Sequence, residues 1–151
     1  MEQFNQYYLD TLKSRYAQFS GRASRSEFWY FILFYFIISI LFSVLDTVLG
    51  TNYTYEVAAN TLVTAGGEMA SATVTQTIGY LSSLFGLLMF IPSIAISIRR
   101  LHDIGKSGWW LLISLIPIIG FFVLIYFYVQ DSQPGENEYG PNPKGFSQRT
   151  A

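Results

Sequence analysis

The sequence contains no cysteine, which excludes disulfides, thiolate metal ligands and cysteine nucleophiles. It is also poor in charge. Only 13% of its 151 residues are charged, whereas a soluble domain carries about 25%. The stretch from Gly50 to Thr77 has no basic residue at all. With 51% hydrophobic residues, this composition indicates a chain that is surrounded by lipid rather than by water.

Three long apolar runs cover about residues 28–45, 78–98 and 109–129. Each is close to the ~20 residues that an apolar helix needs to cross a bilayer. The runs lack the alternation of barrel strands, so they predict helices. We therefore expect an all-α membrane protein that forms one membrane domain over residues 1–151, with three transmembrane helices.

The basic residues predict the orientation. Seven of the nine precede the first run or lie between the second and third. The positive-inside rule then places the N-terminus and the 99–108 loop in the cytoplasm, and the 50–77 loop outside.

Pro117 and Gly120 interrupt the third run, which predicts either one kinked crossing or a re-entrant hairpin. We favour the kinked crossing, because two halves of about ten residues are too short to cross twice. The turn-rich tail, 130–151, would then lie outside.

The N-terminal segment 1–20 carries aromatic and aliphatic residues at helical spacing: Phe4, Tyr8, Leu12, Tyr16 and Phe19. This pattern predicts an amphipathic helix in the cytoplasmic interface, or one that packs on the protein's own loops. Gly21 ends it. The sequence Ser24-Arg25-Ser26-Glu27 then predicts a capping box at the start of the first span.

Several features predict how the spans end and pack. Asp46 lies at the outer boundary of the first span, so we expect it to be solvated. In the 50–77 loop the alternating stretch 72–75 favours a short strand or hairpin. Small residues four apart predict close helix contacts in lipid. These pairs are Ser39–Ser43, Gly79–Ser83, Ser82–Gly86 and Ser93–Ser97.

The densest polar cluster follows the second span, at residues 99–108. Its charges have two interpretations. They bind an anionic lipid headgroup, or they form an inter-helix polar cluster in which Glu27 pairs with Arg99 or Arg100. The headgroup interpretation uses Arg22, Arg25, Arg99, Arg100 and Lys106. The candidate binding residues of the two interpretations together are Arg22, Arg25, Glu27, Arg99, Arg100, His102 and Asp103.

Catalysis has little support. His102 beside Asp103 is a possible proton-transfer pair, since histidine titrates near neutral pH. However, adjacent residues of a helix do not face each other. One histidine without cysteine does not predict a zinc site, and membrane-proximal charges do not predict nucleic-acid binding. We assign no catalytic residue, no metal and no cofactor.

Three motifs occur in order: Gly21 to Trp29, Arg99 to Asp103 with Ser107 to Trp110, and Pro134 to Pro143. Over about residues 4–145 the chain resembles the bacterial family called domain of unknown function 805, which comprises YhaH-type small inner-membrane proteins. The resemblance implies a multi-span protein of the bacterial cytoplasmic membrane and supplies no reaction. It also implies that the three motifs act together, which conflicts with a tail outside the cell.

These observations favour a non-enzymatic membrane module that binds lipids or proteins. Its partners would be membrane lipids, and also itself or other membrane proteins through the small-residue faces. One alternative is an oligomeric small transporter or channel subunit. Another is a membrane enzyme that acts on a headgroup at the cytoplasmic face, with His102 and Asp103 as acid or base.

Overall fold

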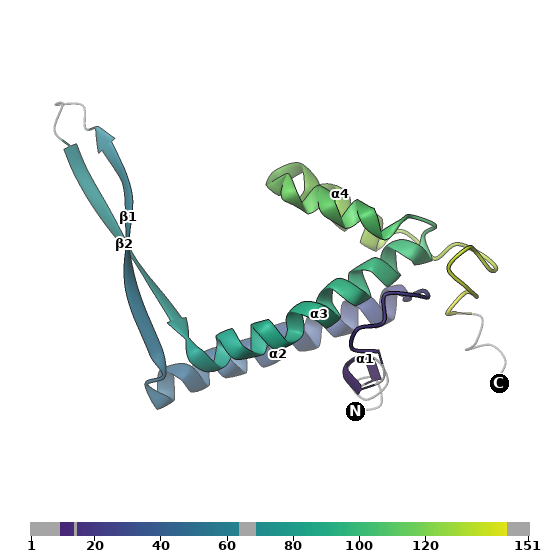
Figure 1. Cartoon of the computed structure of the whole chain (residues 1–151), viewed down its shortest axis with the longest axis horizontal. Coiled ribbons are helices and arrows are strands. Elements are labelled where there is room, and N and C mark those ends of the chain that lie inside the picture. The colour runs from purple at the N-terminus through teal and green to yellow at the C-terminus, as the bar shows by residue number, and fades with distance from the viewer. Residues whose placement is uncertain (1–9, 14, 64–68, 145–151) are drawn as a thin grey trace. The chain divides into compact units, whose positions relative to one another are not determined.

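The computed structural model describes residues 10–13, 15–63 and 69–144. Figure 1 shows the elements, in chain order. They are α1 (Asp10–Lys13), α2 (Arg25–Leu49), β1 (Asn52–Val63), β2 (Met69–Gly79), α3 (Tyr80–Asp103), the 3-10 helix η2 (Gly108–Leu115) and α4 (Pro117–Val129). The chain forms two compact units, Met1–Phe36 with Met89–Ala151, and Ile37–Leu88.

Helices α2 and α3 correspond to the first two predicted spans. With 25 and 24 residues, they are the two described helices that are long and apolar enough to cross a membrane. The Ser24 hydroxyl accepts the Glu27 backbone N–H at 3.2 Å, which satisfies one of the free N–H groups at the start of α2. Pro92 lies inside α3 without ending it.

The prediction of an all-α chain is wrong for residues 50–77, because most of this segment forms an antiparallel hairpin (Figure 1). Asn52 is opposite Gly79, Val57 is opposite Val74, and the register shifts between Ala59 and Leu62. The expected strand at 72–75 lies within β2. Threonine and valine at alternate positions favour such an extended pair, since β-branched residues fit a pleated surface.

The prediction of a solvated Asp46 is also wrong, because its exposed fraction is 0%. Its carboxylate accepts the Thr51 hydroxyl at 2.6 Å, the Leu81 N–H at 2.9 Å and both the N–H and the hydroxyl of Ser82. These donors include the first free N–H groups of α3. Gly79 makes room for them, since a Cβ there would lie 1.9 Å from Asp46 Oδ2. Gly79 is the last residue of β2, so it is not part of the α3 helix on which the Gly79–Ser83 pair was expected.

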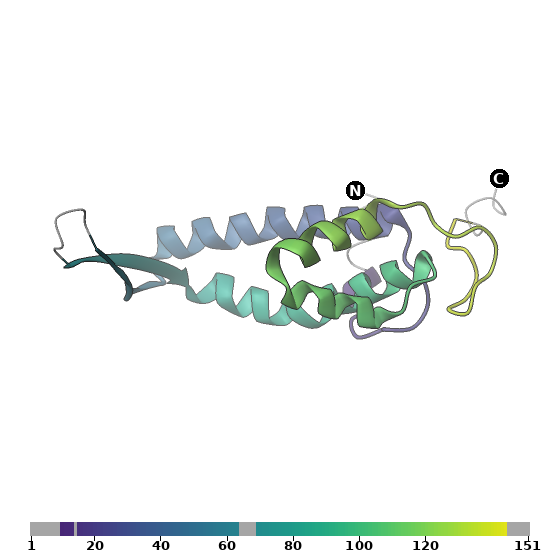
Figure 2. The same cartoon turned by 90° about the horizontal axis from the view of Figure 1, so that it is seen from above.

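The third apolar run is not one kinked helix. η2 ends at Leu115, Ile116 is extended, and α4 begins at Pro117. Figure 2 shows the chain turning back here. Gly120 lies so close to η2 that a Cβ would be 1.9 Å from the Ile113 carbonyl oxygen. The 13 residues of α4 are fewer than the ~20 of a crossing helix, so a third crossing is not confirmed.

The predicted N-terminal helix lies mostly outside the described residues. Within them, α1 covers only Asp10–Lys13. Residues 15–20 form turns and bends, so the expected helix does not extend to Tyr16 or Phe19. A backbone N–H of Gln18 bonds the Arg15 carbonyl at 3.1 Å, which supports that turn.

Candidate functional site

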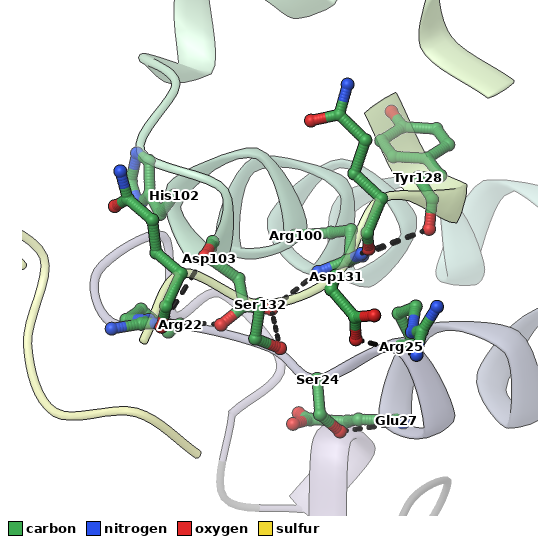
Figure 3. Close-up of polar contacts among 12 residues, drawn as sticks. Arg22, Ser24, Arg25, Glu27, Arg100, His102, Asp103, Tyr128, Asp131 and Ser132 are labelled. Atoms are coloured by element: carbon green, nitrogen blue, oxygen red, sulfur yellow. Dashed lines mark hydrogen bonds and ion pairs between the residues drawn. The ribbon is translucent and has the colours of Figure 1, made fainter. Parts of the chain in front are cut away.

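Asp103, the last residue of α3, lies at the centre of the candidate site and is fully buried. One carboxylate oxygen, Oδ1, accepts the Arg22 Nε–H at 3.0 Å. The other, Oδ2, accepts Arg100 at 2.5 Å and the Ser132 hydroxyl at 2.6 Å (Figure 3). We call Arg22, Arg100, Asp103 and Ser132 the Asp103 cluster. It joins the segment before α2, the end of α3 and the segment after α4.

Arg22 connects the cluster to the tail. Its Nη1 donates to the Gly135 carbonyl at 2.8 Å and to the Gly140 carbonyl at 3.3 Å. Its Nη2 donates to the carbonyls of Gln133 and Asp103. A buried guanidinium needs partners for all its N–H groups, and here the tail backbone supplies most of them. The turn motif of the tail thus acts as a set of acceptors for one cation.

Arg100 connects α3 to the end of α4. Its Nε and Nη2 each donate to the Tyr128 carbonyl at 3.2 Å, and Nη2 also donates to the Gln130 carbonyl. Both carbonyls lie at the C-terminal end of α4, where backbone acceptors lack helical partners and a cation is favourable. Arg100 therefore fixes the C-terminal end of α4 to α3.

A second buried ion pair lies between Glu27 and Arg99, at 2.7 Å. Arg15 reaches the same Glu27 oxygen at 3.4 Å, and the Ala23 N–H donates to the Arg99 carbonyl. Nε and Nη2 of Arg99 are the buried side-chain atoms without a hydrogen-bond partner in the described part of the chain. With Arg22 and Arg100, three buried guanidiniums therefore meet two buried carboxylates, which leaves one excess positive charge.

His102 contacts the tail. Its ring stacks on Tyr139, with centroids 3.8 Å apart and planes 2° from parallel. Nδ1 lies 3.2 Å from the Gly21 carbonyl oxygen, and the Asn137 amide donates to the His102 carbonyl at 2.9 Å. Gly21 has a φ of +88°, a conformation that favours glycine. His102 and Asp103 thus have different partners, as adjacent helical residues should.

Arg25 lies apart from the buried groups. It pairs with Asp131 at 2.6 Å, and the two side chains are 40% and 68% exposed. Lys144 reaches the same carboxylate oxygen at 2.8 Å. This hydrogen bond from Lys144, with the charge of Arg25, lowers the pKa of Asp131 below its usual value.

The seven candidate residues from the sequence are therefore divided among four places. Arg22, Arg100 and Asp103 meet in the Asp103 cluster. Glu27 pairs with Arg99, Arg25 is at an exposed edge, and His102 packs on the tail. No group of three His, Cys, Asp or Glu side chains that could bind a metal occurs among the described residues.

The sequence did not identify several partners at the end of α4 and in the tail: Tyr128, Gln130, Asp131, Ser132, Gln133, Asn137 and Tyr139. Tyr128, Gln130 and Gln133 take part through backbone carbonyls, which have no side-chain signature in a sequence. The other four take part through their side chains. The signal in the sequence was the third motif, Pro134 to Pro143. Its turn residues direct the carbonyls of Gly135 and Gly140 toward Arg22.

Comparisons with known proteins match the sequence to a family. The family described as protein of unknown function, DUF805, matches residues 16–141, and the chain belongs to it. It is 41% identical over 138 residues to inner membrane protein YhaH of Escherichia coli (strain K12). The aligned residues cover 91% of this chain and 96% of that protein. Inner membrane protein YhaI of the same strain is 36% identical over 139 residues, or 92% and 96% of the two chains. No solved structure matches.

Proposed function

We propose that the chain is a non-enzymatic module of the bacterial inner membrane that binds lipid at the cytoplasmic face. The names of YhaH and YhaI support the location. The lengths and apolar compositions of α2 and α3 support two crossings. The basic residues before α2 and after α3 support a cytoplasmic N-terminus.

In this proposal the η2–α4 hairpin is re-entrant on the cytoplasmic side. Arg22 lies just before α2 and bonds the tail carbonyls of Gln133 and Gly135. The segment before the first crossing and the segment after the hairpin are therefore in contact. That contact supports two crossings, since a third would carry the tail to the opposite side.

The observation that carries lipid binding is the exposed apolar surface of the hairpin. Trp109, Leu115 and Ile118 are 76%, 78% and 74% exposed, although the hairpin is fixed to polar groups by Arg100. Neither η2 nor α4 is long enough to cross alone. A surface of this kind is stable where lipid covers it, and its aromatic residues are typical of the membrane interface.

The contacts of the polar residues do not support the enzyme alternative. The polar side-chain atoms of Arg22, Arg100 and Asp103 form hydrogen bonds with one another and with backbone carbonyls. His102 is stacked on Tyr139. A reacting group would need a free atom directed at a substrate, whereas the polar atoms of Arg22, Arg100 and Asp103 are bonded to other groups of the chain.

The test is native mass spectrometry of the full chain purified in a mild detergent. We expect phospholipid to remain bound to the wild type, and less to remain on Gly120→Ala, whose Cβ would meet the Ile113 backbone. Gly86→Ala is the matched control, because no atom lies within 4 Å of its Cβ. A wild type without retained lipid, but with a stoichiometric protein partner, would contradict lipid binding and favour the protein-binding alternative.

A further inference from the structure

A groove of about 380 Å³ lies where the start of α2 faces the end of α4. It is lined by Arg25, Ser26, Trp29, Tyr30, Leu33 and Val129. The α2 residues at 25–26, 29–30 and 33 recur at helical spacing, so they line one face over two turns. The groove therefore has a charged end at Arg25 and an apolar end at Leu33.

The charged end carries an excess of positive charge. Arg25 Nη2 pairs with Asp131 and Nη1 donates to the Val129 carbonyl at 3.3 Å. A guanidinium has five N–H groups, so Arg25 retains donors for an additional acceptor. Lys144 shares the Asp131 carboxylate, and the sum of Arg25, Lys144 and Asp131 is one positive charge. This combination favours an anionic group of the ligand.

The apolar end has the chemistry of an acyl-chain contact. Trp29 and Leu33 are 42% and 49% exposed although they are large and apolar. Tryptophan and tyrosine are enriched at the level of the lipid headgroups, where one part of the ring is wet and the other is apolar. A small free anion would fill only the Arg25 end and would leave the apolar lining uncovered.

We propose that this groove binds one anionic phospholipid, with its phosphate at Arg25 and the upper part of an acyl chain along Trp29, Leu33 and Val129. The inference rests on the proposed function and names the lipid class and the position. Arg22 and Arg100 do not take part, because Asp103 and the tail occupy them. Arg99 does not line the groove. Arg25 is exposed, lines the groove and retains unused donors.

The test compares Arg25→Gln with Arg15→Gln in the full chain. Each change removes one exposed cation from an ion pair, since Arg15 is 45% and Arg25 40% exposed, but only Arg25 lines the groove. Each variant is reconstituted in nanodiscs of mixed phosphatidylglycerol and phosphatidylethanolamine, and retained lipid is identified by native mass spectrometry. We expect about a fivefold loss of preference for phosphatidylglycerol in Arg25→Gln and no loss in Arg15→Gln.

Leu33→Trp separates shape from charge, because it fills the apolar end and leaves Arg25 in place. We expect it to reduce lipid retention, while Arg25→Lys keeps most of the preference. Equal preference in the wild type and Arg25→Gln, with lipid still retained, would overturn this site and leave the proposed function intact. No retained lipid in the wild type would overturn both. Retention of inorganic phosphate in place of lipid would contradict the phospholipid assignment.

Discussion

Two buried aspartates, Asp46 and Asp103, are each fully buried near a helix end but have different kinds of partner. Asp46 accepts from neutral donors, namely hydroxyls and backbone N–H groups up to 36 residues away. Asp103 accepts from two guanidiniums and a hydroxyl, one of them 81 residues away. One carboxylate thus fixes a local junction, and the other joins three distant segments of the chain.

The difference has a consequence for mutations. Neutral donors around Asp46 keep part of their hydrogen bonding if the charge is removed. The cations around Asp103 do not, because a buried charge without its counter-charge is costly. Loss of Asp46 should therefore affect the junction of α2, β2 and α3. Loss of Asp103 should release the tail and the η2–α4 hairpin together.

Asp103→Asn has the largest expected effect. It leaves Arg22 and Arg100 buried without their carboxylate, and breaking a buried pair typically costs ~3–5 kcal/mol. We expect a lower melting temperature in detergent and rapid proteolysis of the tail. Asp131→Asn is the control, because it removes an exposed carboxylate from the same region. Equal melting temperatures for the two variants would contradict a dominant role for Asp103.

Asp46→Ala should have a smaller and more local effect. Without the carboxylate, the amides of Leu81 and Ser82 lose their acceptor, so we expect them to exchange with solvent at least about tenfold faster. Asp46→Asn should lie between Ala and the wild type, since an amide oxygen can still accept. Faster exchange throughout α4 in Asp46→Ala would show that the two carboxylates do not have separate roles.

The smallest effect concerns the pH dependence of the tail. Lys144 and Arg25 hold the pKa of Asp131 below its usual value. A lowered folded pKa means that the contribution is present above the unfolded value of about 3.9 and is lost as the pH falls through the folded value. Wild type and Asp131→Asn should therefore differ in tail proteolysis near neutral pH. The difference should shrink as the pH falls below the usual carboxyl range, and it should be smaller at high salt.

The sequence was informative where one side chain or one periodic pattern decides the structure. The apolar runs predicted α2 and α3, and Ser24 predicted the start of α2. Local patterns failed at the third run, because both a kink and a reversal are compatible with Pro117 and Gly120. The close approach of Gly120 to Ile113 shows that the chain reverses its direction between η2 and α4. Asp46 was misplaced because its donors are two backbone N–H groups and two hydroxyls that only the fold brings together.

The sequence predicted the charged side chains of the candidate site but not the backbone groups that they contact. Charge and position identified Arg22, Arg100 and Asp103. Their actual acceptors are mostly carbonyls of residues 128–140, which depend on the fold of a turn-rich tail. Nothing in the sequence distinguished the exposed Arg25 from the buried Arg22, three residues earlier. That distinction, which now separates a structural cation from a proposed lipid contact, required the packing of α4.

The measurement that tests the central claim most directly is a topology map with single cysteines, since the chain has none. Thr54→Cys, Ser107→Cys and Glu136→Cys place a thiol at exposed positions in β1, before η2 and in the tail. With an impermeant reagent in intact cells, we expect labelling at position 54 alone, because the proposed topology places the three motifs on the cytoplasmic side. Labelling at position 136 as well as 54, without labelling at 107, would contradict the Asp103 cluster and restore a third crossing.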